Sequence, residues 1–230
     1  MANQVHPTAI IDDTVELGLN NVIGPYAVLT GRTTIGDDNW IGPHVVIGSP
    51  AEHLSYHAPG KPPRAVTGKV AIGSRCIIHE HVAIQSPTVA DTVVGDEVLL
   101  THGVHVGHDD VVLDGVTISA NAALAGHVWI GSRATLGMGV VVHQHVNVGP
   151  IAMVGMGSAV HKDVRPFALV TGFPARFSHA NSIGIERAGM ALGAWTDEIS
   201  KPFAVWDLSG FPTASLPFVE QYRDRLAAST

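Results

Sequence analysis

A chain of 230 residues is long enough for one large domain, or for one domain with an appendage. Hydrophobic residues make up 46% and charged residues 14%, which excludes a disordered chain, and the net charge of −7 argues against a nucleic-acid or anionic-membrane partner. The single cysteine, Cys76, excludes an internal disulfide. Since neither a signal-peptide pattern nor a membrane-length apolar run is present, we expect a cytoplasmic protein without stable membrane insertion.

An aliphatic residue recurs every six positions through most of the chain, often followed by glycine. A period of six fits neither an α-helix, with its period of 3.6, nor a simple strand, with its period of 2. It is typical of a parallel β-helix of hexapeptide repeats, in which three hexads close one triangular coil and residues 18 apart stack. We expect roughly seven to eight coils. The repeated positions are Val5, Ile11, Leu17, Ile23, Leu29, Ile35, Ile41 and Ile47, then Ile72, Ile78 and Ile84, then every sixth residue from Val94 to Val160.

Two segments interrupt the period and are expected to loop out of the β-helix. Residues 49–69 contain four prolines, and residues 85–93, QSPTVADTV, form a smaller insertion. Each is either a tolerated surface insertion or a candidate for substrate contact, because loops on a rigid scaffold often carry function.

The repeat stops after Val160, so we divide the chain into a β-helix domain, residues 1–162, and a C-terminal helical region, residues 163–230. Residues 181–195 are helix-like. The spacing of apolar residues over 216–228 predicts a terminal helix whose one apolar face is formed by Phe218, Val219, Tyr222 and Leu226. Such helices commonly cover the open edge of a last coil.

The stretch LTHGVHVGHDD places His102, His105 and His108 at intervals of three. Because these positions face different directions on a triangular coil, one chain cannot gather them around a zinc ion, and we expect no metal site. His108 instead stacks on Gly126 and Gln144, which occupy the same place in the repeat in the next two coils.

His127 follows Gly126 in the sequence, and His143 precedes Gln144, so these residues predict a polar strip along one edge together with His108. We expect His145 to lack a stacking partner and to be an ordinary surface or interface residue.

This strip suits acyl transfer. His108 followed by Asp109 can act as a general base whose ring a carboxylate orients, and Gly126 offers a backbone N–H to an oxyanion. No G-x-S-x-G nucleophile elbow occurs, so direct attack by the acceptor is favoured over a covalent intermediate. No phosphate-binding glycine motif occurs in a suitable context, and we expect no cofactor.

Five stretches, VHPTAI, LLTHGVHVGHDD, ANAALAGHVWIG, VVHQHVNVG and NSIGIERAGM, together resemble the UDP-N-acetylglucosamine acyltransferase family of lipid A biosynthesis. The resemblance covers residues 94–190 closely and the rest loosely. It implies a left-handed β-helix that assembles as a homotrimer, with each active site between two subunits. It also implies transfer of an acyl group from acyl carrier protein to a hydroxyl or amine of a UDP-sugar.

The family's catalytic pair falls on His108 and Asp109, and its oxyanion glycine on Gly126. The resemblance implies substrate contacts at His105, His127, His143, Gln144, Asn181 and Arg187, of which the last two would meet the nucleotide.

The chain departs from the family pattern near the expected sugar and acyl sites. His53 and Ser55 replace a charged pair, and Gln85 stands where the family has histidine, which predicts an altered acceptor contact. Met156 stands where long-chain members carry glycine, which predicts a shorter 3-hydroxyacyl group or else a groove that bends elsewhere.

Three other interpretations stay open. The altered residues would also suit a CoA-dependent N-acetyltransferase acting on a nucleotide-linked amino sugar. A trimeric β-helix carbonic anhydrase also collects histidines from neighbouring subunits, but Val112 and Leu113 stand where its GHxxxxH pattern needs a histidine. The last alternative is a non-catalytic scaffold or binding module.

Overall fold

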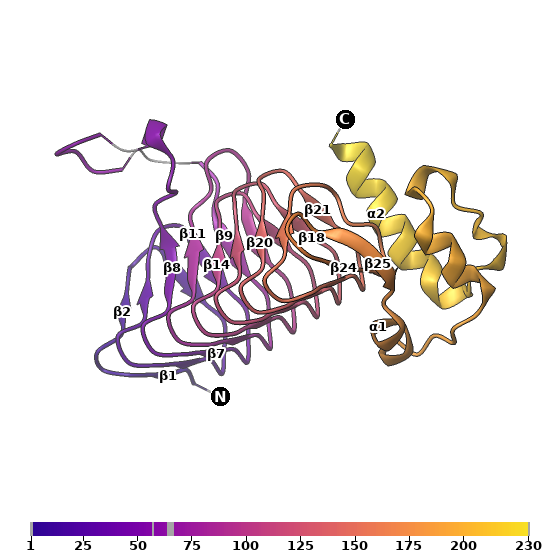
Figure 1. The fold of residues 1–230 in the computed structure, drawn as a ribbon. Coiled ribbons are helices and arrows are strands. Elements are labelled where there is room, and N and C mark those ends of the chain that lie inside the picture. The colour runs from indigo at the N-terminus through magenta and orange to yellow at the C-terminus, as the bar shows by residue number, and fades with distance from the viewer. Residues whose placement is uncertain (1, 57, 64–66, 230) are drawn as a thin grey trace.

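The computed structural model describes residues 2–56, 58–63 and 67–229, and its centre is a stack of coils built from short parallel strands. Figure 1 shows these coils following one another from the indigo N-terminal end to the orange end, where the helices gather. The strands form three sheets, one on each side of the coil. The predicted parallel β-helix is confirmed.

The first sheet joins nine parallel strands and one antiparallel strand. In spatial order its strands are β1 (Gln4–Val5), β4 (Val22–Ile23), β7 (Trp40–Ile41), β10 (Ile77–Ile78), β13 (Leu99–Leu100), β16 (Thr117–Ile118), β19 (Thr135–Leu136), β22 (Met153–Val154), β24 (Ala168–Thr171) and β25 (Arg176–Ala180).

The second sheet contains β2 (Ile10–Ile11), β5 (Val28–Leu29), β8 (Val46–Ser49), β11 (Ala83–Gln85), β14 (His105–Val106), β17 (Ala123–Leu124), β20 (Val141–Val142) and β23 (Ala159–Val160). The third contains β3 (Val15–Leu17), β6 (Thr33–Ile35), β9 (Val70–Ile72), β12 (Thr92–Val94), β15 (Val111–Val112), β18 (Trp129–Ile130) and β21 (Asn147–Val148).

The register explains the sequence period. Regular coils pair residues 18 apart, such as Ala123 with Val141. The repeated aliphatic side chains point inward and stack into one core, in which Leu100, Ile118, Leu124 and Leu136 have no exposed surface. The same core runs the length of the stack, because each inward residue packs on its counterparts in the coils before and after.

Both predicted interruptions lie between strands that still pair, although the register of β8 and β11 shifts by one residue between Ile84 and Gln85. Val46 pairs with Ala83 across the first insertion, and Ala83 pairs with His105 across the second. Figure 1 shows the first insertion leaving the stack as a long excursion, which includes the 3-10 helix η1 (Leu54–Tyr56). Both insertions emerge at the corner between the second and third sheets.

The corner residues adopt a left-handed backbone conformation, which most residue types avoid. Asp109, His127 and His145 have φ angles of 61°, 64° and 62°, and His44 and His81 occupy equivalent positions on another corner. Aspartate, asparagine and histidine are the residues, other than glycine, that tolerate this conformation best. Part of the histidine pattern therefore has a structural cause.

The β-helix continues beyond Val160, where the repeat was expected to stop. Val164 bridges to Val148, and Val170 pairs with Val154. The last coil is two residues shorter than the others, so a strict count by six misses it. This coil takes the first sheet to nine parallel strands in the described chain, above the expected seven to eight coils. The domain boundary at residue 162 stays a prediction.

The tail contains two α-helices, α1 (Ser182–Arg187) and α2 (Leu216–Ala228). The expected helix over 181–195 is wrong beyond Arg187, because Gly189 has a φ of 79° and ends it. Four 3-10 turns follow: η2 (Ala194–Ser200), η3 (Phe203–Val205), η4 (Leu208–Gly210) and η5 (Thr213–Ser215). None of the helices in the described part of the chain is long and apolar enough to cross a bilayer.

Helix α2 forms where the sequence predicted a terminal helix. It buries Val219 and Tyr222, and Tyr222 packs against Trp129 on the outer face of the third sheet. Arg225 donates a hydrogen bond of 2.7 Å to Asn147 on the same sheet. The helix therefore covers the side of the last coils as well as their open end.

Asp110 ties together the two coils that carry the polar strip. It is fully buried, and its two oxygens accept hydrogen bonds of 2.7 Å from the backbone N–H groups of Gly107 and Val128. Burial raises the pKa of Asp110 well above its usual range, although both donors act in the opposite direction.

We expect Asp110→Ala to lower the free energy of unfolding by roughly 2–5 kcal/mol, because it leaves two buried N–H groups without an acceptor. Urea denaturation followed by circular dichroism measures this. Asp13→Ala, at an exposed aspartate, is the control and should change little. Equal stability of the two variants would contradict the role of Asp110.

Candidate active site

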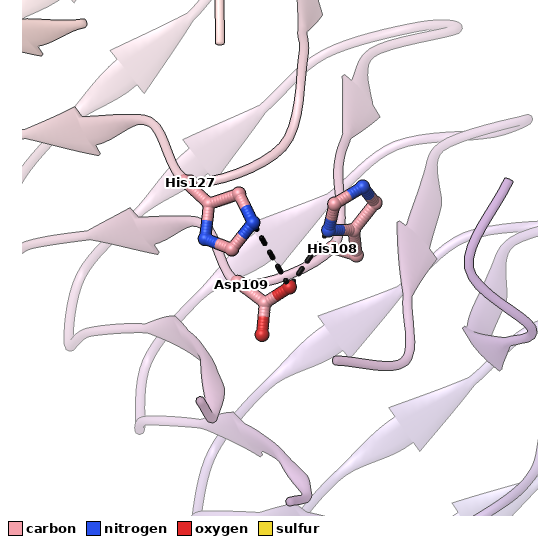
Figure 2. A group of neighbouring side chains, drawn as sticks. All are labelled: His108, Asp109 and His127. Carbon is pink, nitrogen blue, oxygen red and sulfur yellow. Dashed lines mark hydrogen bonds and ion pairs between the residues drawn. The ribbon is translucent and has the colours of Figure 1, made fainter. Parts of the chain in front are cut away.

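His108 and Asp109 lie together on the corner between β14 and β15. His108 Nδ1 and Asp109 Oδ2 are 2.7 Å apart, and Figure 2 shows the rings of His108 and His127 both directed at this carboxylate. The Asp109 side chain is completely buried and that of His108 is 14% exposed. Since Nδ1 donates to the carboxylate, Nε2 is left as the basic nitrogen of the ring.

The second insertion wraps around the Asp109 carboxylate. Oδ1 accepts from the N–H groups of Val89, at 2.8 Å, and Ala90, at 2.7 Å, while Thr88 Oγ1 donates to Oδ2 at 2.6 Å. Burial by itself would raise the pKa of Asp109, but the donors at Thr88, Ala90, Val89 and His108 together lower it to about 2. The carboxylate is therefore ionised throughout the physiological range.

Gly126 lies directly against the His108 ring in the next coil. A Cβ at this position would clash with Cε1, Nε2 and Nδ1 of the His108 ring, so any other residue here would displace the ring. Within the described residues, the Gly126 N–H has no acceptor. A donor without a partner beside a basic nitrogen is the arrangement needed to stabilise an oxyanion during acyl transfer.

His127 and His145 extend the strip along the corner. The His127 ring lies 5.2 Å from that of His108 and stacks on His145 at 4.5 Å, with an interplanar angle of 10°. His145 is exposed, but the expectation that it lacks a stacking partner is wrong, since it occupies the place of His127 in the following coil. Burial lowers the pKa of His127, and His145, His108 and His53 act in the same direction against Asp109.

A cavity of about 430 Å³ opens beside the His108 ring. It brings together several residues predicted for the site, namely His53, Gln85, His105, His108, Gly126 and Gln144. Burial lowers the pKa of His105, while Glu52 on the same wall raises it. The outward residues Ala123 of β17 and Val141 of β20 complete the wall.

Asp109 and His127 lie beside the His108 ring without lining this cavity, and the four remaining predicted residues do not line it either. His143 is exposed, with Nδ1 3.1 Å from the backbone oxygen of Gln144. Asn181 and Arg187 line a different cavity, of about 560 Å³, together with Arg133. Asn181 is buried and caps α1 through a hydrogen bond from the Gly184 N–H. Met156 is 73% exposed, between β22 and β23 on another corner.

His108, Asp109 and His127 form the only group within the described chain whose ligand atoms, all within 4.8 Å of one another, could hold a metal ion. Ligands around a tetrahedral zinc ion with bonds of about 2 Å lie roughly 3.3 Å apart. The 2.7 Å between His108 and Asp109 is a hydrogen-bond distance, and both carboxylate oxygens already accept other donors. The geometry favours an oriented base over a metal site.

Sequence reasoning missed the support of this site. Thr88, Val89 and Ala90 stand in the sequence only as part of an insertion, and nothing in the repeat distinguishes Glu52 or Arg133. The insertion itself is the detectable signal, because it adds residues at the corner that carries His108 and leaves the register intact.

No family model matches the chain. It is 36% identical over 197 residues to the acyl-[acyl-carrier-protein]–UDP-N-acetylglucosamine O-acyltransferase of Gloeothece citriformis, covering 80% of this chain and 68% of that protein. It is 34% identical over 198 residues to the enzyme of the same name from Stutzerimonas stutzeri, covering 80% of this chain and 74% of that protein. This chain belongs to that acyltransferase family.

Solved structures of family members have the same fold. LpxA from Acinetobacter baumannii matches with a TM-score of 0.73 and 26% identity, over 98% of this chain and 92% of that one. UDP-N-acetylglucosamine acyltransferase from Campylobacter jejuni matches with a TM-score of 0.74 and 26% identity, over 98% and 90%. The left-handed β-helix and the acyltransferase class that the sequence implied are thereby confirmed.

Asp109 makes the free energy of unfolding depend on pH in the acidic range. Its folded-state pKa of about 2 lies below the ordinary 3.8, so its contribution is complete above the ordinary pKa and is lost as the pH falls through about 2. We expect the stability difference between wild type and Asp109→Asn to stay constant above about pH 5 and to shrink by about 2 kcal/mol toward pH 2.

Urea denaturation of both proteins across this pH range measures the difference, in which the contributions of all other acids cancel. A difference that does not change with pH would show that the carboxylate is not stabilised by its hydrogen bonds.

Proposed function

We propose that this protein transfers a fatty acyl group from acyl carrier protein to a hydroxyl of a UDP-linked sugar, with His108 as general base. The observation that carries the proposal is the pairing of His108 Nδ1 with Asp109, beside a cavity and beside the Gly126 N–H, which has no acceptor among the residues that the structure describes. The names of the relatives support the substrates and favour a hydroxyl over an amine as the acceptor.

The reaction needs no covalent enzyme intermediate. His108 Nε2 takes the proton of the acceptor hydroxyl as its oxygen attacks the thioester carbonyl carbon. The negative charge that develops on the carbonyl oxygen is stabilised by the Gly126 N–H, and Asp109 stabilises the imidazolium. When the intermediate collapses, the carbon–sulfur bond breaks and the carrier's sulfur takes the proton from His108.

The complete site would require a second copy of the chain. Exposed apolar side chains line the outer faces of two adjacent sheets, including Trp40 and Ile77 on the first sheet and Ile10 and Val141 on the second. Pairing the first sheet of each subunit with the second sheet of the next closes a ring, which supports the homotrimer that the resemblance implied.

That arrangement would give the separate cavity near α1 a role. Arg133 and Arg187 both line it, and guanidinium groups suit the diphosphate of a UDP-sugar. In a homotrimer this cavity would face the next subunit's His108, so the nucleotide would span two subunits, with Asn181 beside it. His53, Gln85, His105, His127, His143 and Gln144 would contact the sugar and the acyl group from the catalytic subunit.

We expect His108→Ala to lower kcat by about 10²–10⁴-fold, because the acceptor then loses its positioned base. Mass spectrometry of the product formed from 3-hydroxyacyl carrier protein and a panel of UDP-sugars, amino sugars included, measures this. His179→Ala, at an exposed histidine on β25, should keep wild-type activity. No product from wild type with any of these acceptors, or a preference for acetyl-CoA as donor, would contradict the proposal.

Met156 would limit the length of the acyl chain. It is exposed at the corner between the first and second sheets, at the far end of the second sheet's outer face from His108. We expect Met156→Gly to raise kcat/KM for longer acyl donors on the order of tenfold, measured by competition between carrier proteins with different acyl chains. An unchanged preference would show that the chain ends elsewhere.

A further inference from the structure

The second insertion is a local addition to an otherwise regular coil. Across it Ala83 pairs with His105, whereas Ala123 in a regular coil pairs with Val141, so four extra residues enter between β11 and β12. They form a turn over residues 86–91, on the same corner as His108 and Asp109. The strands on both sides keep their register, so the added residues change only the corner.

This turn provides most of the donors to Asp109. The N–H of Thr88 lies 3.0 and 3.1 Å from the two carboxylate oxygens, and the N–H groups of Val89 and Ala90 bind Oδ1. The Thr88 hydroxyl donates to Oδ2 at 2.6 Å. Oδ2 is also the oxygen that accepts from His108 Nδ1, so the hydroxyl fixes the atom that orients the base.

The corner by itself would not hold Asp109 in this way. Its backbone is left-handed, with a φ of 61°, and its N–H donates to Thr92 Oγ1 at 2.9 Å. These features place the residue but leave the carboxylate to be oriented by whatever covers it. The turn over 86–91 buries the carboxylate completely and supplies it with donors on both oxygens.

We propose that Thr88 is a positioning residue for the acyl transfer, and that its hydroxyl acts through Asp109 to hold His108 Nε2 toward the cavity and Gly126. This role rests on the proposed function of His108 as the base. If the ring rotates so that Nε2 moves by a fraction of an ångström, much of the alignment on which proton transfer depends is lost.

The same turn is linked to the wall of the cavity. Tyr56 donates a hydrogen bond of 2.9 Å to the backbone oxygen of Thr88, and the His53 ring lies 5.9 Å from both the Tyr56 and the His108 rings. The first insertion and the support of the base therefore meet at Thr88. Thr88→Val keeps this backbone contact and removes only the hydroxyl donor.

We expect Thr88→Val to lower kcat on the order of 10–100-fold with little change in KM, because the substrate contacts remain and the base is misaligned. Thr88→Ser restores the hydroxyl and should recover activity close to wild type. Thr14→Val is the matched control, since Thr14 also donates to a neighbouring coil, at 2.7 Å to the Gly31 oxygen, and lies on the same corner far from His108.

A second measurement needs no substrate. The rate at which diethyl pyrocarbonate modifies His108, followed by peptide mass spectrometry, reports the reactivity of Nε2, with His179 as internal reference. We expect this rate to change several-fold in Thr88→Val, because the orientation and exposure of Nε2 change, and to be unchanged in Thr88→Ser and Thr14→Val. If wild type forms no product, the proposed function fails, and this rate still decides the role of Thr88.

The proposal is overturned if diethyl pyrocarbonate modifies His108 in the Thr88→Val variant at the wild-type rate. It is also overturned if Thr88→Val keeps wild-type kcat, or if the valine and serine variants lose activity equally. The latter result would show that the shape of the threonine side chain matters and its hydrogen bond does not.

Discussion

The structure depends on the stacking of one coil on the next. Each strand between the two ends of the stack pairs with the strands in the coils before and after it, and inward aliphatic residues stack in the same register. A residue added within a strand would turn its inward side chain outward unless a bulge absorbs it, as Gly48 does in β8, so insertions of several residues enter at corners. Both insertions obey this constraint, and both emerge at the corner that carries His108.

The electrostatics of the candidate site follow from that arrangement. Two adjacent aspartates on one corner, Asp109 and Asp110, have pKa values shifted in opposite directions. Asp110 points into the coil, where burial raises its pKa, whereas Asp109 points toward the 86–91 turn, whose donors lower its pKa to about 2. The first residue joins two coils, and the second gives His108 a fixed, permanently charged partner. Gly126 completes the group by leaving room for the ring.

Much of the fold could be predicted because one side-chain position in six is always inside the coil. The prediction was wrong where that count changes: the last coil is two residues short, so Val164 and Val170 were missed, and Gly189 ends α1 early. Adding the 18 residues of one coil to a residue number also predicted that His108 stacks on Gly126 and Gln144. It could equally have placed His127 over His145, whose rings stack at 4.5 Å.

The sequence by itself determined the solenoid, its strand register, the corner that carries His108 and the family to which the chain belongs. These follow from a period that each coil repeats and from local motifs. Only the tertiary structure decided which groups surround the Asp109 carboxylate, and that Asn181 and Arg187 line a cavity apart from His108. The path of a loop is set by hydrogen bonds to residues about 20 positions away, and no period in the sequence records such contacts.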